Sequence, residues 1–436
     1  YQMEEGAVRL NELEELPCTC SVCTSFRIEE LRGKDMAERG SLIAKHNTLL
    51  LEKEVKKARE RIRAGTLREY VEMKVRTATF LTAVLRILDT EEDYFERRTP
   101  VARNHGMSAN TMESLKRVEV KRFAKRVLDR YEPPSRKVLL LLPCSARKPY
   151  STSPSHAKFI EAIDEWRGDI HELIVTSPLG VVPRELEAVY PAAFYDVPVT
   201  GYWDAEEREW VSSCLRGYLA RSVGTYDAVV AHISGAYKEI CTRAAADLGV
   251  EVVYTCKEGE DATSQEALKT LNAQIAGLCG ERKHLSRFEQ KRGMIKAMAD
   301  YHFGIGAGSE LVAWNEDERL KITGTFPRYT LCLDRDVLAR TVPEYGTLAL
   351  TVSGARRISR LRTSYNVEIG DFVPKGSVLA PGVVHADPQI RENDEVIFTG
   401  AKAFGVGRAK MSGWEMVQSR KGVAVQVREV ELRGEA

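Results

Sequence analysis

The sequence predicts a multidomain protein that combines α/β and α+β parts, and three observations predict it. Three cysteines lie within six residues near the start, in Cys18-Thr-Cys-Ser-Val-Cys23. Short unbroken apolar runs alternate with helical patterns between residues 133 and 298, and short strands separated by glycines follow residue 370. We therefore expect a zinc-binding helical module at 1–132, a mostly parallel α/β core at 133–298, a small connecting α+β domain at 299–369 and a small β-barrel at 370–436.

The composition narrows the classes of protein to consider. The 436 residues carry 64 basic and 63 acidic side chains, a formal net charge of +1, so binding to a nucleic acid must rely on local basic patches. The sequence contains no apolar run of membrane-spanning length and no signal peptide, and we expect no membrane partner. Nine cysteines, an odd number, argue against a disulfide framework and predict a reducing cytoplasm. Because the cysteine cluster follows so soon after Tyr1, we expect a fragment or one half of a split protein.

The cysteine cluster is followed by one well-placed histidine, and together these residues predict a structural zinc site. Three thiolates and one imidazole complete a tetrahedral set and leave no position for a reactive water. A closed site of this kind holds a fold together. The expected ligands are Cys18, Cys20, Cys23 and His46.

Two amphipathic helices are expected after the zinc ligands. Apolar residues from Leu51 to Ile62 recur at helical spacing, and the pattern stops at Gly65. Thr66-Leu-Arg-Glu69 is typical of a capping box that opens the next helix, which continues to Leu88. The polar faces are rich in Lys and Arg. A solvated face is the simpler interpretation, and contact with RNA is the alternative.

Five apolar runs predict the strands of the core, and the segments between them predict its helices. Because the runs are continuous rather than alternating, the sheet should be covered on both faces and should be mostly parallel. The expected strands are 138–142, 173–176, 197–200, 228–233 and 252–255, and the expected helices are 155–167, 184–190, 205–222 and 235–248.

The loop after the first of these strands, residues 141–156, gathers many reactive side chains. A loop between a strand and a helix lies at the carboxyl edge of an open α/β sheet, where ligands bind. The simpler alternative is a Pro- and Ser-rich loop whose serines cap a helix. The candidate catalytic residues are Cys144, Ser145, Lys148, Ser155 and His156, with Tyr150 and Ser153 as candidates for substrate binding.

Polar side chains at the ends of the other strands should converge on the same edge and form a pocket. Each has a simpler explanation: Ser234 can cap a helix, and His232 can be a hydrogen-bonded histidine of the core. The further candidates for substrate binding are Ser177, Arg184, Glu185, Asp196, His232 and Ser234.

Short strands punctuated by glycines fill the last part of the chain, a pattern that resembles a PUA domain, a pseudo-barrel that grips structured RNA. Glycines let the backbone approach phosphates, and basic side chains contact them. A barrel with solvated lysines is the alternative for any single residue. The candidate RNA-binding residues are Lys375, Gly376, Gly382, Arg408, Lys410, Arg420 and Lys421.

Two motifs connect the chain to families of tRNA-modifying enzymes. The zinc-ligand spacing, with a basic helix behind it, resembles the zinc subdomain at the C-terminal end of tRNA-guanine transglycosylases. The motif Pro143-Cys-Ser-Ala-Arg-Lys-Pro-Tyr-Ser-Thr-Ser-Pro-Ser-His156, with 176–180 and 182–186, resembles the signature of the archaeosine synthases, the archaeal paralogues of those enzymes. The resemblance extends to the C-terminus. No transglycosylase barrel precedes the zinc motif, so base exchange by this chain is not expected.

The resemblance implies a transferase that acts on tRNA carrying 7-cyano-7-deazaguanine at position 15. The ε-amine of free lysine, or an amino donor such as glutamine, would add to the nitrile and give an amidine on the route to archaeosine. The implied partners are tRNA, free lysine, a radical-SAM enzyme that cleaves the adduct and a separate N-terminal transglycosylase-like subunit; a homo-oligomer is also expected. The alternative is a non-catalytic tRNA-binding subunit that presents the D-loop to a separate transglycosylase or radical enzyme.

The candidate residues suit that chemistry by their types. A nitrile reacts slowly with a protonated amine, so a site must deprotonate the amine and stabilise the developing charge on nitrogen. His156 suits proton transfer, and Lys148 with the hydroxyls of Ser145, Ser153 and Ser155 suits stabilisation of the imidate nitrogen. Cys144 either adds first as a covalent nucleophile or is only a small residue at a strand end. The remaining assignments are Arg184 to the carboxylate of lysine, and Glu185 or Asp196 to its α-amine or to the base.

Overall fold

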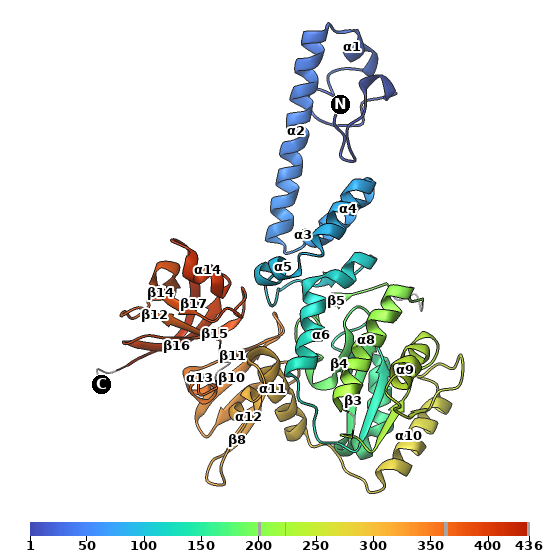
Figure 1. Ribbon diagram of the computed structural model, residues 1–436, viewed down its shortest axis with the longest axis vertical. Coiled ribbons are helices and arrows are strands. Elements are labelled where there is room, and N and C mark those ends of the chain that lie inside the picture. Colours follow the sequence, from blue (N-terminus) through green and yellow to red (C-terminus); the bar gives the residue numbers. More distant parts are fainter. Residues whose placement is uncertain (199–201, 223, 362–364, 434–436) are drawn as a thin grey trace. The chain divides into compact units, whose positions relative to one another are not determined.

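The computed structural model describes residues 1–198, 202–222, 224–361 and 365–433, and the chain divides into two compact units, Tyr1–Glu91 and Glu92–Ala436 (Figure 1). We describe each unit by itself. Among the described residues, no helix combines the length and the apolar character that crossing a membrane requires.

The first unit consists of a metal-site loop followed by helices. The Asp35 carboxylate caps the long helix α2 by accepting hydrogen bonds from the backbone N–H groups of Ala37 and Glu38. The predicted capping box at Thr66 is wrong, because the Thr66 side chain makes no capping hydrogen bond. The helix expected to reach Leu88 is also interrupted by the turn η2. The elements are η1 (Leu10–Glu12), α1 (Ile28–Gly33), α2 (Met36–Arg63), α3 (Leu67–Lys74), η2 (Val75–Thr77) and α4 (Thr79–Leu88).

The second unit contains the predicted α/β core. Its five-stranded sheet has the order β4-β3-β2-β6-β7, in which β3, β2, β6 and β7 are parallel and only β4 is antiparallel. The mostly parallel sheet is therefore confirmed. The strands are β2 (Val138–Pro143), β3 (Ile170–Thr176), β4 (Gly180–Pro183), β6 (Ala228–Ala231) and β7 (Val252–Tyr254).

Helices cover both faces of this sheet, as the continuous apolar strands predict (Figure 1). Leu140 and Leu142 of β2 pack with Phe159 on one face, whereas Leu139 and Leu141 pack on the other. The helices and turns of the core are α5 (Glu92–Arg98), η3 (Met112–Lys116), α6 (Val118–Arg130), η4 (Tyr150–Thr152), α7 (Pro154–Ile163), η5 (Asp164–Asp169), η6 (Arg184–Leu186), α8 (Ala205–Ser222), α9 (Ala236–Ala246) and α10 (Gln265–Cys279).

Two elements of the core differ from the sequence prediction. The strand expected at 197–200 is wrong at residues 197 and 198, which lie in no strand, and residues 199 and 200 lie outside the described part of the chain. The preceding strand β5 (Tyr195–Asp196) instead pairs with β1 (Met107–Ser108). The helix expected at 184–190 is only the single turn η6. Gly180, with a φ of 81°, lets the chain reverse after β3, so that β4 pairs back on β3 in a hairpin and η6 follows β4 directly.

The rest of the second unit forms two further sheets. A four-stranded antiparallel sheet of order β11-β10-β9-β8 is followed by a six-stranded sheet of order β13-β17-β16-β15-β12-β14. Helix α11 crosses the domain boundary expected at 298–299, and the fourfold division of the chain stays a prediction. These elements are α11 (Arg287–Phe303), α12 (Ala307–Leu311), β8 (Leu320–Thr323), β9 (Thr330–Leu333), β10 (Asp336–Val342), β11 (Thr347–Leu350), α13 (Val352–Ile358), β12 (Asn366–Ile369), β13 (Ser377–Leu379), η7 (Ala380–Gly382), β14 (Val383–Ala386), β15 (Glu395–Thr399), β16 (Ala403–Ala409), α14 (Gly413–Gln418) and β17 (Val423–Leu432).

Candidate functional site

The first unit brings together the four residues that the sequence predicts as zinc ligands. The ligand atoms of Cys18, Cys20, Cys23 and His46 all lie within 4.8 Å of one another. The sulfur atoms of Cys20 and Cys23 are 3.6 Å apart, and Nδ1 of His46 lies 3.4 and 3.3 Å from them. Two thiolates bound tetrahedrally at the usual Zn–S length of about 2.3 Å would be about 3.8 Å apart. The donor set and its spacing therefore fit a zinc ion.

The surroundings of His46 fix the nitrogen that faces the cysteines. Its Nε2–H donates a hydrogen bond of 2.8 Å to the backbone carbonyl of Gln2, which leaves Nδ1 free to act as a ligand. The ring of Tyr1 stacks on the imidazole with centroids 3.9 Å apart, and its hydroxyl lies 3.1 Å from Sγ of Cys23. The first two residues thus belong to the metal site, which spacing of the ligands alone does not reveal.

In the second unit, Cys144 lies directly after β2 and shares a hydrogen bond of 3.0 Å between its Sγ and the hydroxyl of Tyr237. The ring of Tyr237 packs edge-on against Trp203. Lys148 follows on the same loop, and its Nζ lies 3.9 Å from the ring centre of Tyr195. We call Cys144, Lys148, Tyr195 and Tyr237 the Cys144 cluster.

A chain of hydroxyl groups extends from the Cys144 cluster into the core. The hydroxyl of Tyr195 hydrogen-bonds to the hydroxyl of Tyr150. Thr176 lies at the end of β3, and its Oγ1 is 2.6 Å from the same Tyr195 hydroxyl. Burial raises the pKa of both tyrosines, so they stay protonated. Burial also lowers the pKa of Lys148, and the nearby Cys144 and Asp196 oppose this effect only in part. A lysine with a lowered pKa exchanges a proton with a substrate more readily than an ordinary one.

Ser177 and Asp196 lie at the border of this region. The hydroxyl of Ser177 donates a hydrogen bond of 2.7 Å to Oε1 of Glu207 on α8. Asp196 is exposed, and its charge acts on Lys148. The structure therefore places Cys144, Lys148, Tyr150, Ser177 and Asp196 at one edge of the sheet.

His156 has a different environment from the one its type suggested. The ring is fully buried, its Nε2–H donates a hydrogen bond of 3.0 Å to the carbonyl of Pro143, and its Nδ1 accepts one of 2.9 Å from Arg184. Burial, followed by the adjacent guanidinium, lowers the pKa of His156 to about 3. Because both ring nitrogens are occupied and the neutral form is held, the imidazole is arranged to support the loop after β2.

Arg184 lies at the centre of a buried ionic network rather than at a free surface. Its Nη2 atom is 2.6 Å from Oε2 of Glu172, and its Nη1 atom is 3.0 Å from Oε2 of Glu187. Arg167 lies on the other side of Glu172, with Nη2 2.7 Å from Oε1. Burial alone would raise the pKa of Glu172, but the two guanidinium groups lower it to about 2. The two arginines and the two glutamates are therefore paired with one another.

The remaining predicted residues of the core make local contacts. Ser153 caps α7 by accepting a hydrogen bond from the backbone N–H of His156, and Ser155 contacts Ser153. Ser145 donates to the carbonyl of Arg147. His232 bonds to Thr255 and to the carbonyl of Ala262, and Ser234 donates to the carbonyl of Glu260. Ser153 thus has the capping role that was the simpler alternative, and His232 is a hydrogen-bonded histidine of the core. Ser234 does not cap α9, whose N-cap is Gly235, and it joins Ser145 and Ser155 in making other local hydrogen bonds.

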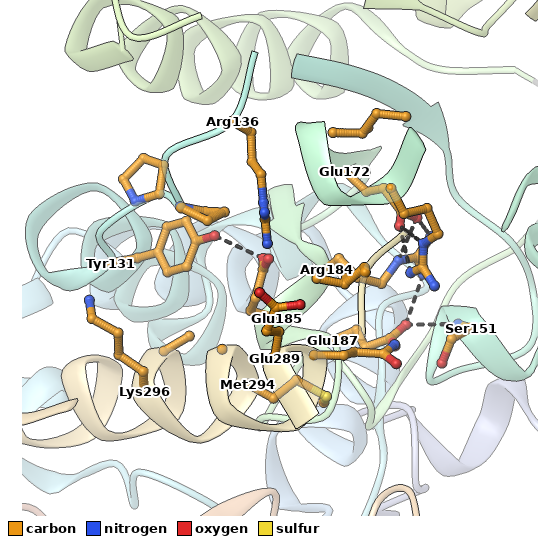
Figure 2. Close-up of a pocket in the computed structure, with 18 of the residues that line it drawn as sticks. Tyr131, Arg136, Ser151, Glu172, Arg184, Glu185, Glu187, Glu289, Met294 and Lys296 are labelled. Atoms are coloured by element: carbon orange, nitrogen blue, oxygen red, sulfur yellow. Dashed lines mark hydrogen bonds and ion pairs between the residues drawn. The ribbon is translucent and has the colours of Figure 1, made fainter. Parts of the chain in front are cut away.

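A cavity of about 510 Å³ lies at the edge of the core, beside β3 and α11. Figure 2 shows Tyr131 directed at Glu185, and Arg184 between Glu172 and Glu187. Of the site residues predicted from sequence, Arg184 and Glu185 line this cavity, whereas the Cys144 cluster does not. The wall is formed by residues in the ranges 131–136, 151–152, 167–172, 184–187, 285–297 and 326–329.

Several residues of these sites were not predicted from the sequence. Tyr195 and Tyr237 lie close in sequence to the predicted residues Asp196 and Ser234. Buried aromatic residues are usual in a core, so the sequence does not distinguish their hydroxyls as functional groups. In the segment Arg184-Glu-Leu-Glu187, the sequence analysis predicted Arg184 and Glu185 to bind substrate, and both line the cavity. The other walls come from several segments spread between residues 131 and 329, which no spacing rule connects.

The predicted RNA-binding residues have unequal positions on the last sheet. Lys375, Lys410, Arg420 and Lys421 are exposed. Arg408 instead lies over the ring of Tyr345, with its guanidinium carbon 4.0 Å from the ring centre. Gly376 has a φ of 82°, which a turn requires. A Cβ atom at Gly382 would lie 2.8 Å from the ring of Phe372, so packing against that ring already explains this glycine.

Four family models match successive parts of the chain. Residues 3–79 match queuine tRNA-ribosyltransferase, residues 120–275 match a domain of unknown function (DUF5591), residues 293–363 match the patch-forming domain C2 of tRNA-guanine transglycosylase, and residues 365–430 match the PUA domain. The expected C-terminal PUA domain is therefore confirmed.

Whole-chain relatives extend these matches. An archaeosine synthase subunit alpha of Methanosarcina acetivorans is 49% identical over 99% of this chain and 68% of its own length. An archaeosine synthase of Haloferax volcanii is 43% identical over 99% of this chain and 71% of its own length. A solved protein of unknown function is 34% identical, with a TM-score of 0.57, and covers 71% of this chain and 99% of its own. The chain therefore belongs to the archaeosine synthase family.

Proposed function

We propose that this chain modifies tRNA by joining the ε-amine of free lysine to the nitrile of 7-cyano-7-deazaguanine at position 15, which gives an amidine. Membership of the archaeosine synthase family supports the synthesis of archaeosine in tRNA. The observation that carries the finer proposal is the Cys144 cluster, in which a thiol and a lysine of lowered pKa lie on one loop at the carboxyl edge of the sheet.

Cys144 is the proposed nucleophile. Its sulfur adds to the nitrile carbon and its proton passes to the nitrile nitrogen, so a thioimidate forms. The amine of lysine then adds to the same carbon, the C–S bond breaks, and the thiol regains a proton from the incoming amine. Atoms balance without water or an oxidant. The hydroxyl of Tyr237, 3.0 Å from Sγ, is placed to exchange that proton.

Lys148 is the proposed acid–base group. Burial lowers its pKa, so it can take the proton from the attacking amine and return it to the departing sulfur. Tyr195, whose ring lies under Nζ, is anchored by its hydrogen bonds to Tyr150 and Thr176. We assign these three residues a positioning role.

His156 and Arg184 are proposed to support the loop after β2 instead of contacting the substrate directly. The pair connects the loop after β2 to the Glu172 network through hydrogen bonds at both imidazole nitrogens. Ser145, Ser153 and Ser155 act in the same way, because their hydroxyls are used locally. Of the groups expected near the substrate, Asp196 keeps an exposed carboxylate beside Lys148.

The PUA domain is the proposed grip on the tRNA backbone. Lys375, Lys410, Arg420 and Lys421 are exposed cations on this domain and suit contacts with phosphates. Arg408 is left out of the set, since its guanidinium is stacked on Tyr345.

The four ligands in the first unit are proposed to hold a structural zinc ion. When bound, the metal crosslinks the loop at 18–23 to α2 and supplies no reaction step, because the three thiolates and His46 fill a tetrahedral shell. A folded first unit would then depend on the metal.

The rival function is a non-catalytic tRNA-binding subunit that serves a separate enzyme. It is favoured by the name of the Methanosarcina acetivorans relative, a subunit alpha, which implies a second subunit for that protein. A partner subunit, a radical-SAM enzyme that processes the adduct, and a homo-oligomer belong to this part of the proposal.

One experiment separates the two functions. Purified protein is incubated with labelled lysine and with tRNA that carries the cyano-modified base, and label on the tRNA is counted. Incorporation that is lost in Cys144→Ala supports the transferase. If wild-type protein binds the tRNA but transfers no label, the non-catalytic function stands instead.

A further inference from the structure

Two exposed aromatic side chains from different parts of the second unit converge on one arginine. Tyr94 belongs to α5, and Trp414 belongs to α14 of the PUA domain. The guanidinium carbon of Arg98 lies 4.0 Å from the ring centre of Tyr94 and 5.4 Å from that of Trp414. The two aromatic residues are 49% and 42% exposed. We call Tyr94, Arg98 and Trp414 the Trp414 platform.

Buried ion pairs hold α5 against the PUA domain. The Nε atom of Arg391 lies 2.9 Å from Oε2 of Glu96, and the Nε atom of Arg122 on α6 lies 3.0 Å from Oε1. Burial would raise the pKa of Glu96, but the two arginines lower it overall, so the carboxylate stays charged and paired. Tyr94 and Arg98 lie on either side of Glu96 in the sequence, and a helix that is fixed in place therefore presents them.

The other half of the platform is fixed by close backbone packing. A Cβ atom at Gly413 would lie 2.0 Å from the carbonyl oxygen of Asp387, so only glycine lets α14 approach this closely. The backbone N–H of Gly413 donates a hydrogen bond of 3.0 Å to the carbonyl of Ile390. The next residue, Trp414, thus starts from a backbone whose position is set by its neighbours.

The charge beside the platform is positive. Two of the three carboxylates of α5 are held in ion pairs, and the third, Asp93, is offset by Arg97 and Arg98. Lys410, which is exposed and lies four residues before Trp414, adds a further cation. An aromatic surface with cations at its edge suits a nucleotide, whose base stacks and whose phosphate is negative.

Trp314 is a half-exposed tryptophan in a different electrostatic setting. It is 41% exposed, and the guanidinium carbon of Arg292 lies 4.6 Å from its ring centre, so it matches Trp414 in exposure and in its arginine neighbour. The exposed Glu316 and Asp317 follow it closely in the sequence and repel phosphates. The two tryptophans therefore differ in the charge around them, which favours RNA at Trp414 only.

We propose that the Trp414 platform stacks an unpaired nucleobase of the tRNA, with the base against the ring of Trp414 and its phosphate beside Arg98. The proposal deepens the proposed grip on tRNA and rests on it in one respect, that the bound RNA is a tRNA. It adds α5, which lies outside the PUA domain, to the RNA-binding surface. It also adds a different kind of contact, because stacking on an aromatic ring needs an unstacked base and not only a charged backbone.

The test compares tRNA binding by the full-length wild type, Trp414→Ala and Trp414→Phe in filter-binding titrations. Trp414→Ala should bind tRNA about tenfold more weakly, because it loses the stacking surface. Trp414→Phe should keep most of the affinity, since it retains an aromatic ring. The slope of log affinity against log salt should be the same in all three, because no charge is removed. Binding of tRNA should also quench part of the tryptophan fluorescence of wild type, and Trp414→Phe should lack that part.

Trp314→Ala is the matched control and should bind tRNA as wild type does. A blunt duplex RNA, which offers no unpaired base, should bind wild type and Trp414→Ala equally. A tRNA without its unpaired 3′ nucleotides identifies the source of the base. A loss in Trp414→Ala that disappears with this probe places the base at the 3′ end, and a loss that persists places it in a loop; either result supports the platform.

Equal affinity of wild type and Trp414→Ala for tRNA, or an equal loss with the duplex, would overturn the platform. Labelled lysine that still reaches tRNA in that case would leave the transferase function standing. Wild-type protein that binds no tRNA would reject the grip on tRNA together with the platform. Binding that depends on Trp414, without transfer of lysine, would support the platform and reject the transferase.

Discussion

The Nη2 atom of Arg184 donates a hydrogen bond of 2.9 Å to Nδ1 of His156, and this contact makes the histidine a support of the loop after β2. A protonated imidazole would lose that acceptor and face a guanidinium. Burial and this neighbour therefore lower the pKa of His156 from its usual 6.5 to about 3. The contact has a consequence for stability that can be measured.

His156→Gln should change the pH dependence of unfolding. In wild type the unfolded chain gains a proton on this histidine below pH about 6.5, whereas the folded chain does not until pH about 3. The stability from the neutral histidine is thus present above pH about 6.5 and is lost as the pH falls toward 3. Between pH 7 and 5, wild type should lose about 2 kcal/mol more than the variant. Urea unfolding followed by tryptophan fluorescence measures the difference, and His284→Gln, an exposed site, is the control.

The sequence predicts the place of this loop but not the partner of its histidine. The continuous apolar run of β2 and the helical pattern of α7 define where the loop lies. Arg184 reaches His156 because β4 pairs with β3 in a register that puts Pro183 opposite Leu173, and so brings Arg184 beside Glu172. That register depends on the β3–β4 hairpin, for which the sequence analysis predicted no second strand.

The spacing of residues in the sequence predicts the metal site but not the cavity. Three zinc ligands lie within six residues and the fourth lies on the next long helix, so chain connectivity alone brings them together. Arg136, Glu185 and Glu289 meet only because three segments of the fold enclose one volume. A contact between such distant segments has no local pattern, and the sequence could supply only the residue types.

Cys144→Ala should abolish lysine transfer while tRNA binding stays the same. Loss of the nucleophile removes the covalent step, and the expected fall in rate is several orders of magnitude. Single-turnover transfer of labelled lysine measures the rate, and a filter-binding assay measures the affinity for tRNA. Cys332→Ala, a partly exposed free cysteine on β9, is the matched control and should react as wild type does. Near-full turnover by the Cys144 variant would rule out the thioimidate.

Asp196→Asn should shift the pH–rate profile of transfer toward lower pH. Burial lowers the pKa of Lys148, and the negative charge of Asp196 raises it in part. Removal of that charge lowers the pKa of Lys148 further, so the active, neutral amine should appear at a lower pH. The rising limb of single-turnover rate against pH gives the shift, and Asp317→Asn, an exposed site in the connecting segment, should leave it in place. A limb that moves upward, or does not move, would remove Lys148 from the role of base.

Removal of zinc should unfold the first unit and leave the second folded. The metal would hold the loop at 18–23 to α2, while all five tryptophans lie in the second unit. Treatment with a chelator should therefore reduce the helical circular dichroism but leave tryptophan fluorescence unchanged. Cys20→Ser should copy the effect without chelator, and elemental analysis should find one zinc per wild-type chain. A chelator-treated protein with unchanged circular dichroism would contradict a structural metal.

Lys410→Ala and Lys421→Ala should each weaken tRNA binding and reduce its dependence on salt. Both side chains are exposed on the PUA domain, and a lysine that neutralises one phosphate contributes about one unit to the slope of log affinity against log salt. Arg408→Ala should leave that slope unchanged, because its guanidinium is stacked on Tyr345 and its removal should instead lower the thermal midpoint. Titrations of labelled tRNA at several salt concentrations give the slopes, with Lys269→Ala on α10 as the exposed control. Equal slopes for Lys410→Ala, Lys421→Ala and wild type would place the phosphate contacts on another surface.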